Sequence, residues 1–353
     1  MGVLKPFLHA LAAGVLAALL CVFLNTPLPW MIGPLFATAG LRLAGRELSA
    51  PVRVREAGQW AIGTALGLYF TAPVLGVLAA RAGWIALAVV FALALGCFCA
   101  WLLHKLSRTD RTTAFFAMAV GGASEMAVQG EHHGANVERV AAAHSLRIML
   151  VVGILPFAMR YWSQHGLGMG ADLYVTGARV VDVPGLLALI LITACAALAL
   201  KRCRIPNAWV IGPLLMTMTL TGFGIHLSSL PEWIVKAGQL FIGISLGTRF
   251  TPGFLRTAPR YLACVAGCSV LALALAATFG LALARLAGLN PGTAILATSP
   301  GGIAEMSLTA QTLHLGVPIV TAFHVARMVI LVLAIGPLFR RMKYTSCRRS
   351  VRG

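Results

Sequence analysis

Long apolar runs constrain this chain more than any other feature. A bilayer's ~30 Å hydrocarbon layer requires a helix of roughly 17 to 25 apolar residues, and only segments that satisfy their own backbone hydrogen bonds are stable inside it. At least ten candidate segments can be drawn, among them 7–24, 84–103, 184–200, 261–284 and 317–339. With 59% apolar and 11% charged residues, the chain has too little polar surface for a soluble globule. We therefore predict an all-α polytopic membrane protein.

Three motifs occur twice in the chain, once in each half and at nearly the same offset. Ala-Val-Gly-Gly-Ala-Ser-Glu-Met at 119–126 returns as Ser-Pro-Gly-Gly-Ile-Ala-Glu-Met at 299–306. The pattern Pro-x-x-Trp-x-Ile-Gly-Pro-Leu stands at 27–35 and 206–214, and Ala-Gly-Gln-x-x-Ile-Gly-x-x-Leu-Gly stands at 57–67 and 237–247. These recurrences predict a first membrane repeat at 1–160, a linker at 161–183, a second repeat at 184–340 and a basic tail at 341–353.

Each repeat contains a predicted break in its helical pattern. The breaks fall at Gly121 and Gly122 and at Pro300, Gly301 and Gly302, because glycine and proline destabilise helix interiors. Irregular backbone is tolerated at membrane depth only where protein or a water-filled cavity covers it. We expect a broken or re-entrant helix in each repeat, and each break is a candidate binding site.

A charged constellation follows each break. It consists of a glutamate, a later histidine and an arginine one helical turn beyond it, and both intervals are the same in the two copies: Glu125, His144 and Arg147, then Glu305, His324 and Arg327. An ionised group at mid-membrane costs on the order of 2.5 to 3.5 kcal/mol, so we expect each glutamate to pair with an arginine. The groups suit proton coupling, and free amides at broken helix ends suit an anion. Salt bridges that only fix helix register are the alternative.

The other repeated segment supplies glycines and an amide. Gly63 with Gly67, and Gly243 with Gly247, form flat helix faces that let another backbone approach closely. Gln59 and Gln239 place an amide in apolar surroundings. Helix packing and contact with a substrate are both open for these two glutamines.

The net charge of +18 lies mainly in short loops, a distribution that sets membrane orientation. With five crossings and one re-entrant segment per repeat, and the amino terminus inside, 21 of the 28 basic residues fall on the cytoplasmic side. This arrangement inverts the second repeat relative to the first and places both termini in the cytoplasm. No segment has the size of a helix-turn-helix, so we expect no direct binding of nucleic acid.

The repeated blocks resemble the bacterial AbrB-duplication membrane family, and the resemblance covers almost the whole chain. It implies one module present twice, with a fold similar to inverted-repeat cation/proton antiporters and anion transporters. The matching motif positions are Gly121, Gly122, Glu125 and Met126, and Gly301, Gly302, Glu305 and Met306. The halves differ in that Pro300 precedes the second glycine pair, whereas Val120 precedes the first.

We expect a secondary transporter of the cytoplasmic membrane that moves a small, anionic solute with proton or sodium coupling. The alternative is a membrane-embedded sensor that influences gene expression indirectly. We expect no enzymatic activity, since none of the common nucleophile, phosphate-loop or zinc motifs is present, and no cofactor. Glu131-His132-His133 lacks a third ligand at a convincing spacing, so we interpret it as a solvated turn and expect no metal.

Overall fold

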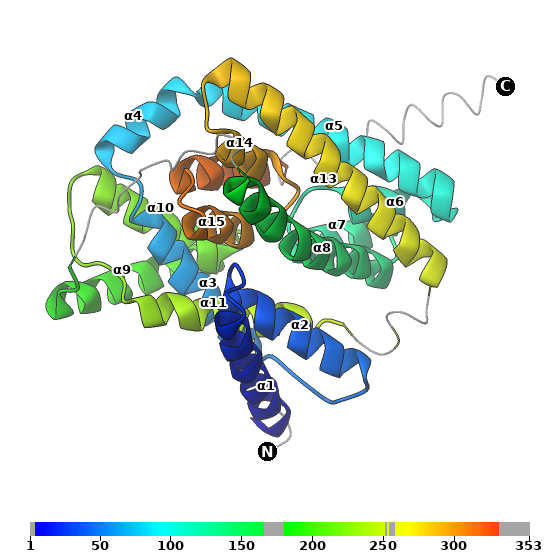
Figure 1. Cartoon of the computed structure of the whole chain (residues 1–353), viewed down its shortest axis with the longest axis horizontal. Helices are drawn as coiled ribbons and strands as arrows, with labels where there is room; N and C mark the ends of the chain where they lie inside the picture. Colours follow the sequence, from blue (N-terminus) through cyan, green and yellow to red (C-terminus); the bar gives the residue numbers. More distant parts are fainter. Residues whose placement is uncertain (1–3, 166–179, 251–252, 254–257, 332–353) are drawn as a thin grey trace.

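The computed structural model describes residues 4–165, 180–250, 253 and 258–331, and its regular structure is entirely helical. The first half contains α1 (Leu4–Phe23), α2 (Pro29–Leu43), α3 (Val52–Gly67), α4 (Ala72–Ala80), α5 (Ala82–Ser107), α6 (Arg111–Met118), α7 (Ala123–His132) and α8 (Val137–Gln164). The second contains α9 (Val183–Arg202), α10 (Ala208–Gly222), α11 (Glu232–Gly247), α13 (Pro259–Ala287), α14 (Pro291–Thr298), α15 (Ile303–Thr312) and the helix Val317–Leu331. Figure 1 shows them along the chain.

The helices follow the same order in both halves. α10 begins at Ala208 where α2 begins at Pro29, and α14 begins at Pro291 where α6 begins at Arg111, so the offset between matching helices is the offset between the repeated motifs. Matching caps start the two short helices, because Asp110 accepts a hydrogen bond from Thr113 N and Asn290 accepts from Gly292 N. Side-chain oxygens at this position satisfy amides that a helix start leaves unpaired.

Five of the described helices are long and apolar enough to cross a membrane, and the number rises to six if α3 and α4, bent by 88° to one another, form one span. The five are α1, α5, α8, α9 and α13. Ten full crossings were expected, so the count by length is lower. The reason is that α2, α3, α10 and α11 have only 15 or 16 residues, about 23 Å at 1.5 Å per residue.

Two helices lie next to the boundaries of the repeated motifs. Most of residues 72–83, directly after the first glycine face, form α4, a helix of nine residues. The predicted linker begins at residue 161, and α8 continues to Gln164. The rest of the linker up to residue 179 and the basic tail lie outside the described residues.

The Gly-Pro pairs of the Trp motif lie within helices. Both α2 and α10 start before the Gly-Pro pair and contain Pro34 and Pro213 in their interiors. A β-carbon at Gly33 would lie 2.7 Å from the Ala17 carbonyl carbon. The glycine therefore brings α2 against the backbone of α1.

The predicted glycine faces pack across the two halves. A β-carbon at Gly63 of α3 would overlap the carbonyl oxygen of Val210 in α10, and one at Gly243 of α11 would lie 2.5 Å from the carbonyl oxygen of Met31 in α2. Val210 and Met31 hold the same position of the Trp motif, each directly after its tryptophan. Each half thus presents its glycine face to the same helix of the other half, as close backbone packing requires.

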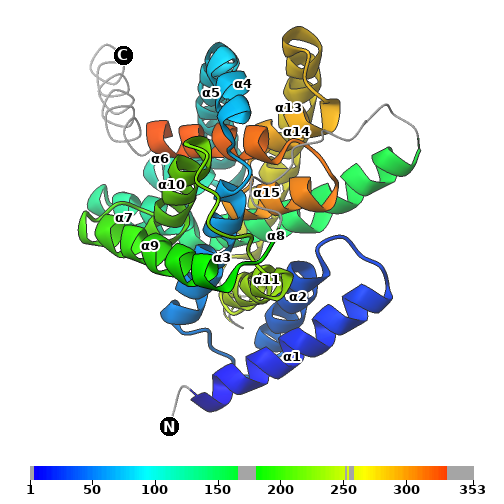
Figure 2. The same ribbon diagram turned by 90° about the vertical axis from the view of Figure 1, so that its left-hand side faces the viewer.

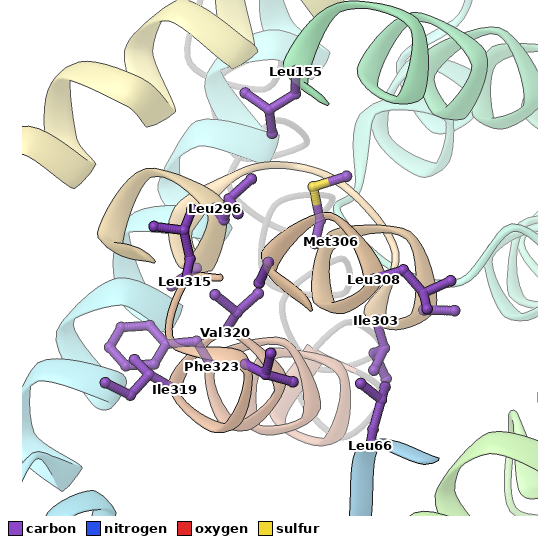
Figure 3. Packing of buried hydrophobic residues seen from close by; sticks show 14 of the residues in the cluster. Leu66, Leu155, Leu296, Ile303, Met306, Leu308, Leu315, Ile319, Val320 and Phe323 are labelled. Carbon is purple, nitrogen blue, oxygen red and sulfur yellow. The ribbon is translucent and has the colours of Figure 1, made fainter. Parts of the chain in front are cut away.

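The helices form two ends with the motif helices between them. In both ribbon views, α1 and α2 lie at one end, and α4, α5 and α13 lie at the other (Figures 1 and 2). A buried apolar cluster joins Leu66 of α3 to Ile303 of α15, and Figure 3 shows Leu66 beside Ile303 with Leu308 and Met306 nearby. The second glycine-pair segment is therefore packed against α3.

Candidate functional site

Each glycine-pair segment folds back as a helical hairpin. Asn136, directly before α8, donates its backbone N–H to Thr113 Oγ1 near the start of α6 at 2.8 Å. Gly316 donates in the same way to Thr293 Oγ1 near the start of α14 at 2.9 Å. After its second short helix the chain has therefore returned to the level where the first one began. The segments are hairpins of re-entrant shape, one of the two forms that the sequence left open.

The two hairpin tips meet at one cavity of about 140 Å³. Ten of the twelve predicted site residues line it: Gln59, Gly121, Gly122, Glu125, Arg147, Gly301, Gly302, Glu305, His324 and Arg327. Apolar residues of α10, α11 and α15 complete the wall, among them Val210, Ile242, Leu246 and Ile303. Both breaks, each predicted as a candidate binding site, therefore lie at one cavity.

The polar lining of the cavity divides by burial. We call the mouth the four half-buried polar residues Arg55, Gln59, Asn207 and Arg249. We call the floor the four polar residues that are at least nine-tenths buried, Arg147, Glu305, His324 and Arg327. Polar groups at these depths must be paired, or must face a space that another polar group can enter.

The second glycine of each tip makes room for the glutamate. Gly122 is the N-cap of α7 and Gly302 the N-cap of α15, so Glu125 and Glu305 stand three residues into their helices. Each carboxylate folds back over its N-cap, since a β-carbon at Gly122 would overlap Glu125 Oε2 and one at Gly302 would overlap Glu305 Oε2. A negative charge in the first turn is stabilised by the helix dipole.

The first glycine of each tip lies against the motif methionine. A β-carbon at Gly301 would lie 2.6 Å from Met306 Cγ, and one at Gly121 would lie 3.0 Å from Met126 Cε and 2.7 Å from Leu331 Cδ2. Both methionine side chains are fully buried. The glycines of the motif Gly-Gly-x-x-Glu-Met therefore pack against its glutamate and methionine, and Gly121 packs against Leu331 as well.

The arginines bind backbone carbonyls of the hairpins. Arg327 donates to the carbonyl oxygens of Ser299 at 2.6 Å and Gly301 at 2.5 Å, and Arg147 donates to that of Ala119 at 3.1 Å. Carbonyls at a helix C-terminus lack partners within the helix and attract cations. Each arginine therefore caps the first helix of its own hairpin.

This corrects the expected pairing of glutamates with arginines. Within the described residues, the ion pairs closer than 4.0 Å are Lys201 with Glu56 and Lys236 with Glu232. Neither Glu125 nor Glu305 is in such a pair. The helix ends stabilise the two kinds of charge separately. The carboxylates lie at helix N-termini, where the partial charge is positive, and the guanidinium groups lie at helix C-termini, where it is negative.

The two histidines differ although their sequence positions match. His144 Nε2 donates to the carbonyl oxygen of Phe116 at 2.9 Å, and its Nδ1 accepts from Arg147 Nη2 at 2.8 Å. His324 Nδ1 is bonded to the Val320 carbonyl oxygen at 2.9 Å. Its Nε2 is buried without a partner within the described part of the chain. His144 is thus fully satisfied, whereas His324 is not.

His144 and Gln239 were predicted as site residues, but neither lines the cavity. His144 is buried behind Arg147, where it orients that guanidinium. Gln239 lies half-buried on α11, whereas its equivalent Gln59 reaches Asn207 Oδ1 at 3.5 Å.

The structure adds three mouth residues that sequence reasoning missed. Arg55 and Arg249 were counted among the loop charges that set orientation, and Asn207 was treated only as part of the Trp motif. A signal was present, because the equivalent positions of the other half carry Val235, Tyr69 and Leu28. At each of these three positions, one copy of the repeat carries a more polar residue than the other copy. In this chain that difference occurs at the polar residues of the cavity mouth.

No group of three or more His, Cys, Asp or Glu side chains that could hold a metal ion occurs within residues 4–165, 180–250, 253 and 258–331. Glu131 and His132 lie in the last turn of α7, where both are exposed. The polar side chains that line the cavity carry guanidinium, carboxylate, imidazole, amide and hydroxyl groups.

Comparisons with known proteins agree over most of the chain. The family model described as "Transition state regulatory protein AbrB" matches residues 30–343. The chain is 26% identical over 335 residues to "Uncharacterized protein YhjN" of Bacillus subtilis (strain 168), covering 89% of this chain and 87% of the relative. It is 26% identical over 334 residues to "Putative regulator AbrB" of Escherichia coli (strain K12), covering 93% and 94%. No solved structure matches significantly.

Proposed function

This chain belongs to the AbrB family, and we propose that it is a secondary transporter that moves a small anionic solute across the bacterial cytoplasmic membrane, coupled to protons or sodium. One observation carries the proposal. Two helix breaks, each with its glutamate and its arginine, line a single cavity among apolar helices. Broken helices around a central polar site are the common construction of membrane transporters.

The charges around the cavity favour an anion. Four arginines line it, Arg55, Arg147, Arg249 and Arg327, against the two carboxylates Glu125 and Glu305. The N-termini of α7 and α15 also point their partial positive charge toward the tips. Glu305 is the group best placed to bind a proton or sodium ion, because its carboxylate is buried and has no ion-pair partner among the described residues.

The proposal includes two halves of opposite orientation, with both termini in the cytoplasm. The reciprocal packing of α3 with α10 and of α11 with α2 is what a two-fold relation between the halves requires. In the orientation proposed from loop charge, Arg55, Asn207 and Arg249 all lie on the cytoplasmic side. The mouth of the cavity then opens toward the cytoplasm.

Reconstituted uptake tests this function. Purified full-length protein in liposomes should take up at least one small carboxylate under an imposed proton or sodium gradient, and Glu305→Gln should abolish the coupling. Gly267→Ala is the matched control, because Gly267 lies exposed on α13 where a β-carbon would meet nothing within 4 Å. Uptake that is independent of both gradients would contradict the coupled mechanism.

A membrane-embedded sensor is the second candidate, favoured by the regulator named in the Escherichia coli relative. In that case the cavity would bind a signal and not pass it. Tight binding of a solute, together with no uptake under either gradient, would favour the sensor. A change in transcription upon deletion would not decide between the two, since loss of transport also alters gene expression.

A further inference from the structure

His324 lines the cavity floor, and its imidazole has an unused hydrogen-bond acceptor. The carbonyl oxygen of Val320 can only accept a hydrogen bond, so the hydrogen of the neutral imidazole lies on Nδ1. Nε2 is then a lone-pair acceptor, fully buried and without a partner among the described residues. A buried acceptor that stays unpaired is costly. A donor on a bound molecule would remove that cost.

The mouth favours a hydrogen-bond acceptor, in contrast to His324, which favours a donor. Arg55 and Arg249 both line the cavity, as do Glu125 and Glu305. Within the described residues neither guanidinium has a hydrogen-bonded acidic partner, and Arg55 Nε is buried without any partner. Guanidinium groups are the donors that bind the two oxygens of a carboxylate most strongly.

We infer that the solute carries a carboxylate, held at the mouth by Arg55 and Arg249, and a hydroxyl or amino group that donates to His324 Nε2 at the floor. This inference rests on the proposed function and narrows its solute class to small hydroxy or amino carboxylates. The cavity of about 140 Å³ is several times the ~10–15 Å³ of such volume that one water needs. It therefore has room for a small acid but not for a large one.

Matched pairs of acids test the inference. Binding to the purified full-length protein in nanodiscs is measured by calorimetry for acetate and glycolate, propionate and lactate, butyrate and 3-hydroxybutyrate, and succinate and malate. Alanine provides the amino counterpart of lactate. In at least one pair the acid with the donor should bind at least about tenfold more tightly, because a site built around a donor strongly rejects the analogue that lacks it. Lactate and alanine separate a hydroxyl from an amino donor.

Two sets of variants separate the two ends of the site. His324→Leu should remove the preference for the donor and leave the affinity for the plain acid within about threefold. Arg55→Gln and Arg249→Gln should weaken both members of a pair by a similar factor and leave the preference unchanged. His324→Gln, whose side-chain oxygen can accept a hydrogen bond, should keep part of the preference, and it covers the case in which the leucine variant does not fold.

The outcomes also distinguish a failure of this inference from a failure of the proposed transport function. Equal affinity for both members of every pair would overturn the role of His324 and leave an anion transporter intact. A donor preference that persists in a folded His324→Leu protein would equally overturn that role. If no carboxylate binds to the wild-type protein, both the inference and the anionic class of the proposed function are wrong.

Discussion

The carboxylate of Glu305 lies in the space that a β-carbon at Gly302 would occupy. The same relation holds between Glu125 and Gly122. The glycine pair therefore does more than interrupt a helix. It lets the acidic side chain fold over the start of its own helix, at the tip where the two hairpins meet.

Replacement of Gly302 by alanine should displace this carboxylate. We expect Gly302→Ala to destabilise the protein by roughly 1 to 3 kcal/mol, as overpacking does, and we expect the cost to shrink in a Glu305→Ala background. Thermal unfolding in detergent measures both. Gly267→Ala, at an exposed site with open space, should not destabilise. An equal cost in both backgrounds would show that the carboxylate is not what the new methyl group meets.

The arginine caps predict the outcome of a double-mutant cycle. Arg327→Met should cost roughly 1 to 3 kcal/mol, because it leaves the Ser299 and Gly301 carbonyl oxygens without their donor. Glu305→Gln should add to this cost with a coupling below about 0.5 kcal/mol. The double variant should fold and fail to transport. A buried ion pair would instead give a large favourable coupling, since removal of one partner strands the other charge.

The glycine faces predict a loss of folded protein. Gly63→Leu and Gly243→Leu should each lower the yield of monodisperse protein, because the new side chain meets the backbone of α10 or α2. Gly267→Leu serves as the control on a face with open space. Fluorescence-detected size exclusion compares the three. Normal profiles for both core variants would mean that these faces do not hold the halves together.

The proposed transport requires a second conformation, and one pair of positions predicts a contact in it. Tyr69, directly after α3, and Gln311, in the last turn of α15, belong to elements that pack together in this structure. The equivalent positions of the other half carry Arg249 and Glu131, and Arg249 lies at the open mouth. We expect these opposite charges to meet when α7 packs on α11 and the cavity opens on its other side.

Cysteine cross-linking in a cysteine-free background tests this second conformation. The pair Tyr69→Cys with Gln311→Cys should cross-link rapidly in the present conformation. The pair Arg249→Cys with Glu131→Cys should cross-link more slowly, and each cross-link should stop uptake. A protein that transports freely with either cross-link in place would rule out this exchange of contacts.

The orientation proposed from loop charge is tested by labelling of single cysteines. We expect cysteines at Ser49 and Ser346 to be protected from an impermeant thiol reagent in intact cells, and a cysteine at Thr176 to react. Permeabilised cells provide the control, in which Ser346→Cys must react. Labelling of Ser346→Cys in intact cells would reverse the orientation and place the cavity mouth outside.

The sequence predicted those features of the site that depend on the backbone preferences of glycine and proline. The positions of Gly121 and Gly122 were enough to expect a break, but the two equal spacings did not show that both breaks meet at one cavity. The expected pairing of each glutamate with an arginine was wrong, since a sequence does not show that carbonyl oxygens of a broken helix end will compete for the guanidinium. Arg55 and Arg249 were missed because a charge that lines a cavity mouth looks the same in sequence as a charge in a loop.

The difference between His144 and His324 was beyond sequence reasoning for a related reason. Both precede an arginine by three residues, and only the direction in which that arginine donates decides whether the imidazole is satisfied. Arg147 donates to His144, whereas Arg327 donates to carbonyl oxygens of the tip. The equal spacing determines where the histidine and the arginine lie along each helix. The packing around each hairpin tip determines which groups they are hydrogen-bonded to.

The exchange of glycine contacts between the halves has an evolutionary consequence. Gly63 contacts Val210, and Gly243 contacts Met31. The glycine face of each half is therefore covered by the other half, and it would be exposed if its own half stood alone. The halves contact one another as two subunits of a dimer do. A gene that encodes only one such module would therefore need to make a protein that dimerises, and fusion of two copies into a single chain would free each copy to diverge, as Asn207 and Leu28 have.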